Sequence, residues 1–191
     1  MPPSPLRNGV AKALKNANAE LGSRGFVLKV YDCYRPQKAV KAFVQWAAKG
    51  AGTETSSRYH PHVAKSSLIP LGYIAPKSSH SSGIAVDLTI AASGERQKTP
   101  ASVGAINLCT DPAEDSGVLP SIDMGTAFDC FDPKSHTSTT GLTPKQVGNR
   151  QLLVDVMSRY GFVNYPREWW HFTHRPSAGD ATSHDFTVTR Q

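Results

Sequence analysis

The sequence predicts an α+β fold, in which helices pack on a small, mostly antiparallel sheet. Segments with apolar residues at helical spacing alternate with short runs rich in β-branched and aromatic residues. The chain has 191 residues, enough for a buried core, and contains neither an internal repeat nor a domain linker. We therefore expect residues 1–191 to form one compact domain.

The first half of the chain predicts two helices and two strands. Residues 6–21 carry one apolar stripe that ends at two glycines: Val10, Leu14, Ala17 and Leu21, then Gly22 and Gly25. Residues 26–31 (F-V-L-K-V-Y) predict a strand. Pro36 suits the first turn of a second helix, whose apolar face holds Val40, Phe43, Val44 and Ala47. Residues 49–77 predict a loop and residues 83–90 a second strand.

The second half begins with a long polar stretch, residues 91–142, of the kind that often forms a functional loop. A third helix follows: Thr143 can cap it, Pro144 fits its first turn, and Gln146 completes a capping box. Its buried stripe comprises Leu153, Val156, Met157 and Tyr160, and Gly161 ends it. Residues 162–165 and 170–173 predict closing strands.

Composition excludes several classes of protein. The net charge is +6, but Lys and Arg are scattered without a dense basic run, so we expect no nucleic-acid partner. No run of 18 apolar residues exists, so we expect no membrane span. The first residues lack the apolar stretch of a secretory signal. The compartment stays open between the cytoplasm and, if a signal has been removed, the periplasm; the oligomeric state is also open.

The chain has three cysteines, none of them in a C-x-x-C pair. In an oxidising compartment Cys109 and Cys130 could form a disulfide, which would leave Cys33 free. Three ordinary buried thiols fit the sequence equally well.

Two separated motifs supply the ligands of a hydrolytic zinc site. His80 and Asp87 lie in S-S-H-S-S-G-I-A-V-D-L-T (78–89), and His171 lies in E-W-W-H (168–171). A catalytic zinc keeps three protein ligands and one open position for water. On a strand, Asp87 would point away from Val86 and Leu88, and a buried carboxylate needs a partner. Taken singly, Asp87 could instead be satisfied by backbone amides, and His171 could be an ordinary core histidine.

Glu168 is the candidate general base. It is three residues from His171, so on a regular strand the two side chains would oppose one another. Pro166 favours a turn here, which places Glu168 at a bend from which its carboxylate could reach a bound water. The other histidines are weaker candidates: His60 and His62 form an H-x-H pair that could bind metal, while His136, His174 and His184 are expected to face solvent or lie behind the ligands.

These motifs resemble those of the D-alanyl-D-alanine dipeptidases (VanX type), zinc peptidases of the M15 group. The resemblance includes D-C-Y-R-P-Q-K-A-V (32–40) and D-M-G-T-A-F-D (123–129), and it extends over residues 6–188. It implies the compact α+β zinc fold that is also seen in hedgehog signalling domains. It also implies one Zn²⁺ ion and the following roles: zinc ligands His80, Asp87 and His171, catalytic base Glu168, catalytic arginine Arg35, ammonium-binding Asp129 and substrate-contacting Ser78.

Each implied role has a physical reason. Zinc lowers the pKa of bound water to about 7, and Glu168 can take the proton and pass it to the leaving amine. Arg35 can stabilise the oxyanion, although taken alone it could simply pair with Asp32. Asp129 would favour a free dipeptide, since a longer peptide brings no ammonium to that place.

The expected function is therefore zinc-dependent hydrolysis of the small dipeptide D-Ala-D-Ala to two D-alanines. Two alternatives are a D,D-carboxypeptidase or peptidoglycan endopeptidase of the same group, and a non-catalytic zinc-binding module. The first of the two tryptophans in E-W-W-H argues against a carboxypeptidase, whose relatives usually have proline there. Members of the family also carry a longer segment before the first helix, so pocket closure and selectivity are expected to differ here. Recycling of D-alanine and glycopeptide resistance would use the same chemistry.

Overall fold

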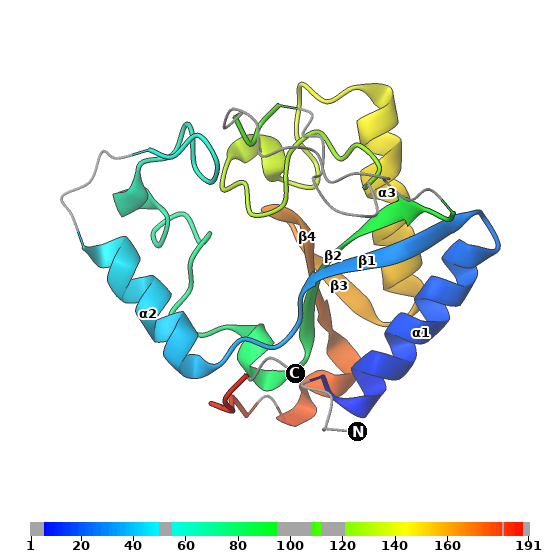
Figure 1. The fold of residues 1–191 in the computed structure, drawn as a ribbon, viewed down its shortest axis with the longest axis horizontal. Coiled ribbons are helices and arrows are strands. Elements are labelled where there is room, and N and C mark those ends of the chain that lie inside the picture. The colour runs from blue at the N-terminus through cyan, green and yellow to red at the C-terminus, as the bar shows by residue number, and fades with distance from the viewer. Residues whose placement is uncertain (1–5, 50–54, 95–107, 112–120, 181, 189–191) are drawn as a thin grey trace.

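A four-stranded sheet forms the centre of the fold. In this computed structural model, which describes residues 6–49, 55–94, 108–111, 121–180 and 182–188, the strand order is β1-β2-β4-β3 (Figure 1). The strands are β1 (Phe26–Asp32), β2 (Ala85–Ala92), β3 (Phe162–Tyr165) and β4 (Glu168–His174). Each pairing is antiparallel, as the sequence predicted.

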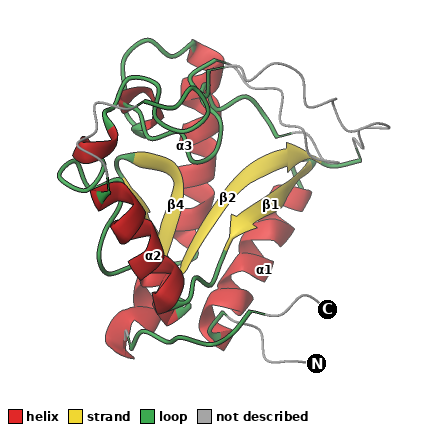
Figure 2. Ribbon diagram, turned by 60° about the vertical axis from the view of Figure 1, so that its left-hand side comes forward, coloured by secondary structure: helices red, strands yellow, loops and turns green. Residues whose placement is uncertain are grey.

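In the part of the chain that the structure describes, three α-helices lie on the two sides of the sheet. Helices α1 (Asn8–Gly22) and α3 (Pro144–Arg159) contact each other on one side of it, and α2 (Gln37–Ala48) lies on the other side (Figures 1 and 2). The described residues also form four short 3-10 helices: η1 (Lys65–Ser67), η2 (Ser79–Ser82), η3 (Pro133–Ser135) and η4 (Arg175–Asp180). The predicted α+β class is thereby confirmed. None of the described helices has the length and apolar character that crossing a membrane requires.

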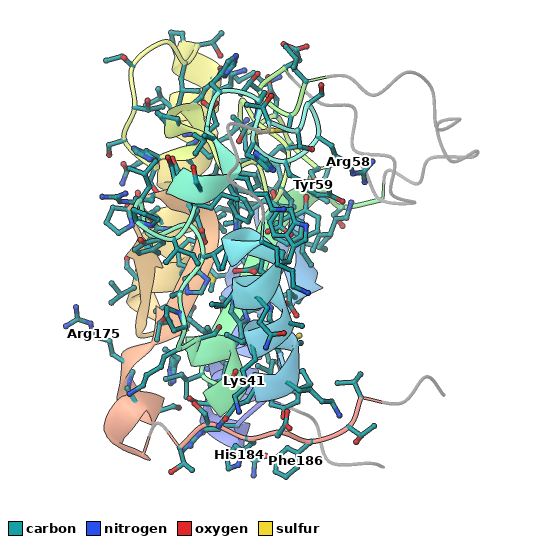
Figure 3. All side chains as sticks on the ribbon, turned by 90° about the vertical axis from the view of Figure 1, so that its left-hand side faces the viewer. Lys41, Arg58, Tyr59, Arg175, His184 and Phe186 are labelled. Atoms are coloured by element: carbon teal, nitrogen blue, oxygen red, sulfur yellow. A yellow bond between two sulfur atoms is a disulfide. The ribbon has the colours of Figure 1, made fainter. Side chains whose placement is uncertain are left out.

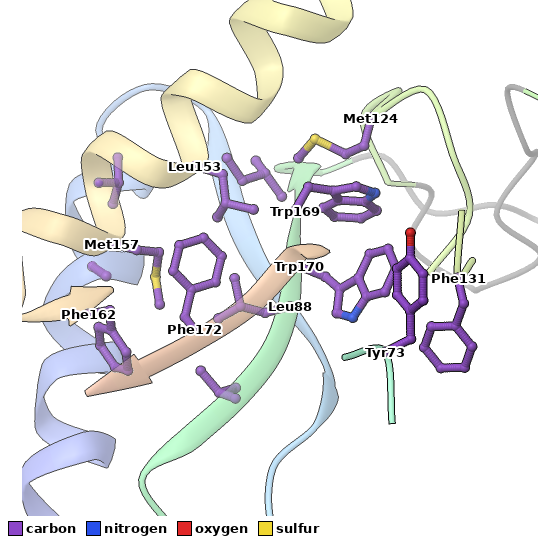
Figure 4. Close-up of a cluster of buried hydrophobic side chains, with 14 of the residues drawn as sticks. Tyr73, Leu88, Met124, Phe131, Leu153, Met157, Phe162, Trp169, Trp170 and Phe172 are labelled. Atoms are coloured by element: carbon purple, nitrogen blue, oxygen red, sulfur yellow. The ribbon is translucent and has the colours of Figure 1, made fainter. Parts of the chain in front are cut away.

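The main core lies between the sheet and helices α1 and α3. From β2, Leu88 points into it, as Phe172 does from β4, and both are fully buried. Leu153 and Met157 meet them from α3 (Figure 4). The alternation on β2 sends Val86, Leu88 and Ile90 to this side and leaves Asp87 for the opposite side.

Helix α3 starts where its capping signals predict. Thr143 Oγ1 accepts a hydrogen bond from the Gln146 amide, and the Gln146 side chain accepts one from the Thr143 amide at 2.8 Å. This reciprocal box satisfies two amides that the first turn would otherwise leave unpaired. The helix then presents Leu153, Val156 and Met157 to the core.

Truncation of Leu153 should destabilise the protein strongly. The side chain is fully buried, so Leu153→Ala leaves a cavity and is expected to lower the free energy of unfolding by about 2–5 kcal/mol. Val147→Ala on the same helix is the matched control, because Val147 is 49% exposed and its truncation should cost less than about 0.5 kcal/mol. Urea titrations measure both; equal losses would contradict this description of the core.

The helix predicted after Pro36 is confirmed as α2. On its apolar face Val40 and Ala47 are buried, whereas Phe43 is 38% exposed. The reason is that Val40 and Phe43 face a cavity rather than the sheet. Helix α2 is thus one wall of that cavity.

Candidate metal centre and substrate cavity

The site is built on one row of residues across the sheet. Asp87 on β2 is paired with Asp32 on β1 and with His171 on β4. Directly opposed side chains in antiparallel strands lie within about 5.5 Å of each other. The sheet register therefore brings Asp87 and His171 together, although 84 residues separate them in the sequence.

His80 enters from η2, just before β2. Ser78 caps this short helix through its side chain, and Gly83 ends it in the left-handed conformation with φ 64°. The strand predicted from residue 83 therefore begins only at Ala85, after this tight turn. His80 Nδ1 donates a hydrogen bond to the Cys33 carbonyl at 2.7 Å, since a carbonyl can only accept. In the neutral ring this leaves the lone pair on Nε2, which points toward Asp87 and His171.

A bulge in β4 brings Glu168 and His171 to the same site. Asn164 on β3 is paired with Phe172, and the next residue, Tyr165, is already paired with Glu168. One residue further along β3 therefore corresponds to four residues along β4, and the extra residues of β4 form the bulge. The Asn164 side-chain amide donates to the carbonyls of Glu168 and His171, each at 3.0 Å. Glu168 therefore lies at a bend, as expected, and its Oε2 is 4.0 Å from His171 Nδ1.

His80, Asp87 and His171 could hold a metal ion. Their ligand atoms all lie within 4.8 Å of one another. Asp87 Oδ1 is 2.9 Å from His171 Nδ1 and 3.2 Å from His80 Nε2, and the two nitrogens are 3.1 Å apart. A carboxylate oxygen and two imidazole nitrogens converge on one point with little access to water. Such a donor set fits a divalent cation.

The charges of this centre depend on one another. Burial would raise the pKa of Asp87, but hydrogen bonds from His171 and His80 outweigh it and hold that pKa well below its usual range. Burial would lower the pKa of His80, yet the contact with Asp87 raises it. Burial and then the negative charges of Asp87 and Asp129 raise the pKa of Glu168 well above its ordinary value. Glu168 is thus suited to exchange a proton.

Arg35 pairs with Asp32 and also lies close to Asp87. Its Nε and Nη2 donate to Asp32 Oδ2 at 3.1 and 2.6 Å, which is the simple pairing considered from the sequence. Its Nη2 is also 3.7 Å from Asp87 Oδ2, at the edge of the metal centre. The Arg35 backbone is attached to η2, because Ser81 Oγ donates to its carbonyl at 2.8 Å. Asp32 therefore orients the guanidinium so that its Nη2 also lies beside Asp87.

Asp129 approaches the site from the loop between β2 and α3. Burial, followed by the negative charge of Asp87, raises the pKa of Asp129 to about 7. The loop is fixed from α3 by Arg150, which is buried and donates to the carbonyls of Met124, Lys134 and His136 at 2.6–3.0 Å. Burial lowers the pKa of this guanidinium to about 10. The helix thus determines where the Asp129 loop lies.

A single cavity of about 260 Å³ joins these groups. All seven residues singled out from the sequence line it: Arg35, Ser78, His80, Asp87, Asp129, Glu168 and His171. Its far wall is largely apolar, with Phe43 from α2, Ile74 and Phe131. The arrangement can hold a cation at one end and a small molecule beside it.

Among the remaining histidines, the expectation for His174 was wrong. His60, a weaker metal-ligand candidate, is buried, and its Nδ1 bonds to the Val63 carbonyl. His174 is 6% exposed, packs on Phe162 and bonds to Ser177, so it neither faces solvent nor supports the ligands. Both rings fill space in packed regions, and isolated histidines in a sequence cannot be distinguished from such cases. His62 pairs with Asp132 at 2.8 Å.

Nearly the whole chain also matches a known peptidase family. The profile of the Peptidase_M15 family, described as D-ala-D-ala dipeptidase, matches residues 6–107 and 98–189. The chain belongs to the M15 peptidase family. Three relatives are called D-alanyl-D-alanine dipeptidase. That of Enterococcus faecium is 33% identical over 94% of this chain and 77% of its own length. Those of Enterococcus faecalis and Streptomyces coelicolor are 34% and 31% identical, over 85% and 92% of this chain and 69% and 76% of their own lengths.

This M15 peptidase contains site residues that the sequence did not single out. Asn164 stabilises the bulge, but an Asn inside a predicted strand gives no sign of this. Tyr165 lies edge-on to His171, with ring centroids 6.0 Å apart, and donates to the Gly72 carbonyl. Tyr73 and Lys77 also line the cavity. Asp32 differs from these residues, because its position three residues before Arg35 had suggested that the two side chains pair.

Proposed function

We propose that this protein is a zinc-dependent D,D-dipeptidase that hydrolyses D-Ala-D-Ala to two D-alanines. The observation that carries the proposal is the shared cavity: three metal-ligand candidates, a buried carboxylate, an arginine and a second carboxylate line one space. Membership of the M15 family and relatives called D-alanyl-D-alanine dipeptidase support the same reaction.

His80, Asp87 and His171 would hold the zinc ion. When bound, zinc supplies a water of lowered pKa and polarises the substrate carbonyl. The Cys33 carbonyl fixes the His80 tautomer, and the weaker contact of Ser79 Oγ with His171 Nε2, at 3.5 Å, leaves His171 Nδ1 for the ligand role. Both imidazoles thereby present a lone pair to the same point.

Glu168 acts as the general base and then as the general acid. It is buried at the bend of β4, with Oε2 close to His171 and no arginine bound to it among the described residues. Its carboxylate takes the proton from the attacking water and delivers it to the departing amine. Burial raises the pKa of Glu168, so its carboxylate is a stronger proton acceptor than an exposed one.

Arg35 stabilises the oxyanion that forms as the carbonyl carbon becomes tetrahedral. The guanidinium stays charged, because Asp32 and then Asp87 and Asp129 outweigh the lowering effect of burial on its pKa. Its two bonds to Asp32 hold it in place before the reaction, so little reorganisation is needed.

Asp129 binds the free ammonium group of the dipeptide. We expect Asp129→Asn to raise KM for D-Ala-D-Ala about 10- to 100-fold, the loss of one charge-assisted hydrogen bond, while zinc content is unchanged. Asp155→Asn is the matched control, because Asp155 lies on the exposed face of α3. Initial rates of D-alanine release over a substrate series measure KM; an unchanged KM would remove Asp129 from the binding site.

One comparison of substrates tests the proposed reaction. The zinc-loaded protein should release D-alanine from D-Ala-D-Ala and should leave an N-acylated tripeptide ending in D-Ala-D-Ala intact, because the blocked peptide offers Asp129 no ammonium. Cleavage of the blocked peptide would instead indicate a D,D-carboxypeptidase or endopeptidase. Zinc binding with no turnover of either substrate would indicate a non-catalytic zinc module.

A further inference from the structure

Asp129 has an unusual backbone. In the described part of the chain it is the one non-glycine residue with a positive φ, 59°. This left-handed conformation is unfavourable for residues with a side chain, and it persists where the surroundings enforce it. Among the described residues, none donates a hydrogen bond to the Asp129 carboxylate, which lines the cavity. The position of this carboxylate is therefore set by the backbone on either side of it.

Both sides are attached to the same residue, Cys109. Two positions before Asp129, the Ala127 amide donates to the Cys109 carbonyl at 2.8 Å. Directly after Asp129, Cys130 forms a disulfide with Cys109, with the two Cα atoms 5.5 Å apart. Both cysteines are buried, at 3% and 0% exposure. The disulfide considered from the sequence is thus formed, and Cys33 is free.

Cys109 is in turn fixed to the neighbouring segment. Its amide donates to the Ser57 carbonyl at 2.8 Å, and the Phe131 amide donates to the Tyr59 carbonyl at 2.6 Å. Figure 3 shows Tyr59 far from the C-terminal segment that carries His184 and Phe186, so this attachment is separate from the chain ends. Three segments are thus joined at the point where Asp129 turns toward the cavity.

We propose that the Cys109–Cys130 disulfide positions the Asp129 carboxylate for the substrate's ammonium group, so that dipeptide binding depends on the redox state of these cysteines. The proposal rests on the proposed function. Without the S–S bond, the chain after Asp129 loses its covalent attachment to Cys109, and Asp129 can relax from its left-handed conformation. Cys109 and Cys130 are positioning residues in this scheme, and the zinc ligands are not affected.

Reduction of the Cys109–Cys130 disulfide takes two electrons and two protons. A dithiol breaks the S–S bond by thiol–disulfide exchange and passes two electrons and two protons to Cys109 and Cys130. Two protein thiols form, and the dithiol closes to its own cyclic disulfide.

The test measures KM and kcat for D-Ala-D-Ala with the zinc-loaded full chain, oxidised and after treatment with dithiothreitol. We expect KM to rise about tenfold on reduction, with kcat and zinc content unchanged, as for the weakening of one charge-assisted hydrogen bond. The double variant Cys109→Ala/Cys130→Ala should show the raised KM without reductant and no further response to it. Cys33→Ala should retain the tenfold response, because its thiol is outside the disulfide.

Two controls separate positioning from general stability. Val156→Ala truncates a fully buried core side chain on α3 and should lower the melting temperature without changing KM. Propionyl-D-Ala, a substrate analogue without the amine, should inhibit D-alanine release with the same inhibition constant before and after reduction, because its binding does not use Asp129.

The outcomes are distinct. A KM that changes less than twofold on reduction overturns the role of the disulfide while leaving the dipeptidase proposal intact. A tenfold rise in KM of the double variant on treatment with the dithiol, or an equal weakening of inhibition by propionyl-D-Ala, also overturns it. Failure of the oxidised protein to release any D-alanine would refute the proposed function, and the disulfide inference with it.

Discussion

Replacement of Glu168 by glutamine is expected to lower kcat for D-Ala-D-Ala by about 10³-fold or more, with KM and zinc content little changed. General acid–base groups typically contribute about 10²–10⁴ in rate, and in the proposed mechanism Glu168 carries out both proton transfers. Glutamine keeps the shape of the side chain but cannot accept the proton. Steady-state rates of D-alanine release, with zinc content measured on the same samples, test this expectation.

Glu20→Gln is the matched control for this variant. Glu20 is on α1, where it pairs with Arg24 and Arg159 at the surface, so its replacement should leave kcat unchanged. Retention of more than a tenth of the kcat by Glu168→Gln would assign the proton transfers to another group. Loss of zinc from that variant would instead make Glu168 part of the metal centre.

Replacement of Arg35 by lysine is expected to lower kcat about 10²-fold. Loss of a single oxyanion donor typically costs about 10²–10³ in kcat. Two guanidinium nitrogens bind Asp32, and Nη2 also faces Asp87 at 3.7 Å; a single ammonium cannot reproduce this geometry. The substitution preserves the charge, so the variant tests geometry alone.

Arg159→Lys provides the comparison for Arg35→Lys, since Arg159 pairs with Glu20 on the surface. We expect its kcat to equal that of the wild type. A kcat for Arg35→Lys within threefold of the wild-type value would show that Arg35 serves mainly to pair with Asp32, the simpler role considered from the sequence.

Local signals in the sequence predicted most of the secondary structure. The capping box at Thr143 and Gln146 located the start of α3, and the β-branched runs located β1 and β2. These features depend on contacts within a few residues, which is why they can be read locally. The apolar stripe of α2 predicted the helix but not that Phe43 faces the cavity, because an amphipathic pattern does not say what covers its apolar face.

The geometry of the site needed the tertiary structure. The motifs identified His80, Asp87 and His171, but their convergence depends on the register between β2 and β4. Spacing alone would have separated Glu168 from His171, and only the bulge opposite Asn164 brings them to one side. The sequence raised the Cys109–Cys130 disulfide as one possibility, but the positive φ of Asp129 has no local signal, because the contacts that enforce it come from distant segments.

The most direct test of a zinc dipeptidase site formed by His80, Asp87 and His171 is D-alanine release from D-Ala-D-Ala after zinc has been removed and then returned. A chelator should abolish release, and one equivalent of Zn²⁺ per chain should restore it. Asp87→Ala, treated in the same way, should bind zinc weakly and stay inactive. If the wild-type protein kept full activity when metal analysis detected no bound zinc, a zinc site formed by these three residues would be contradicted.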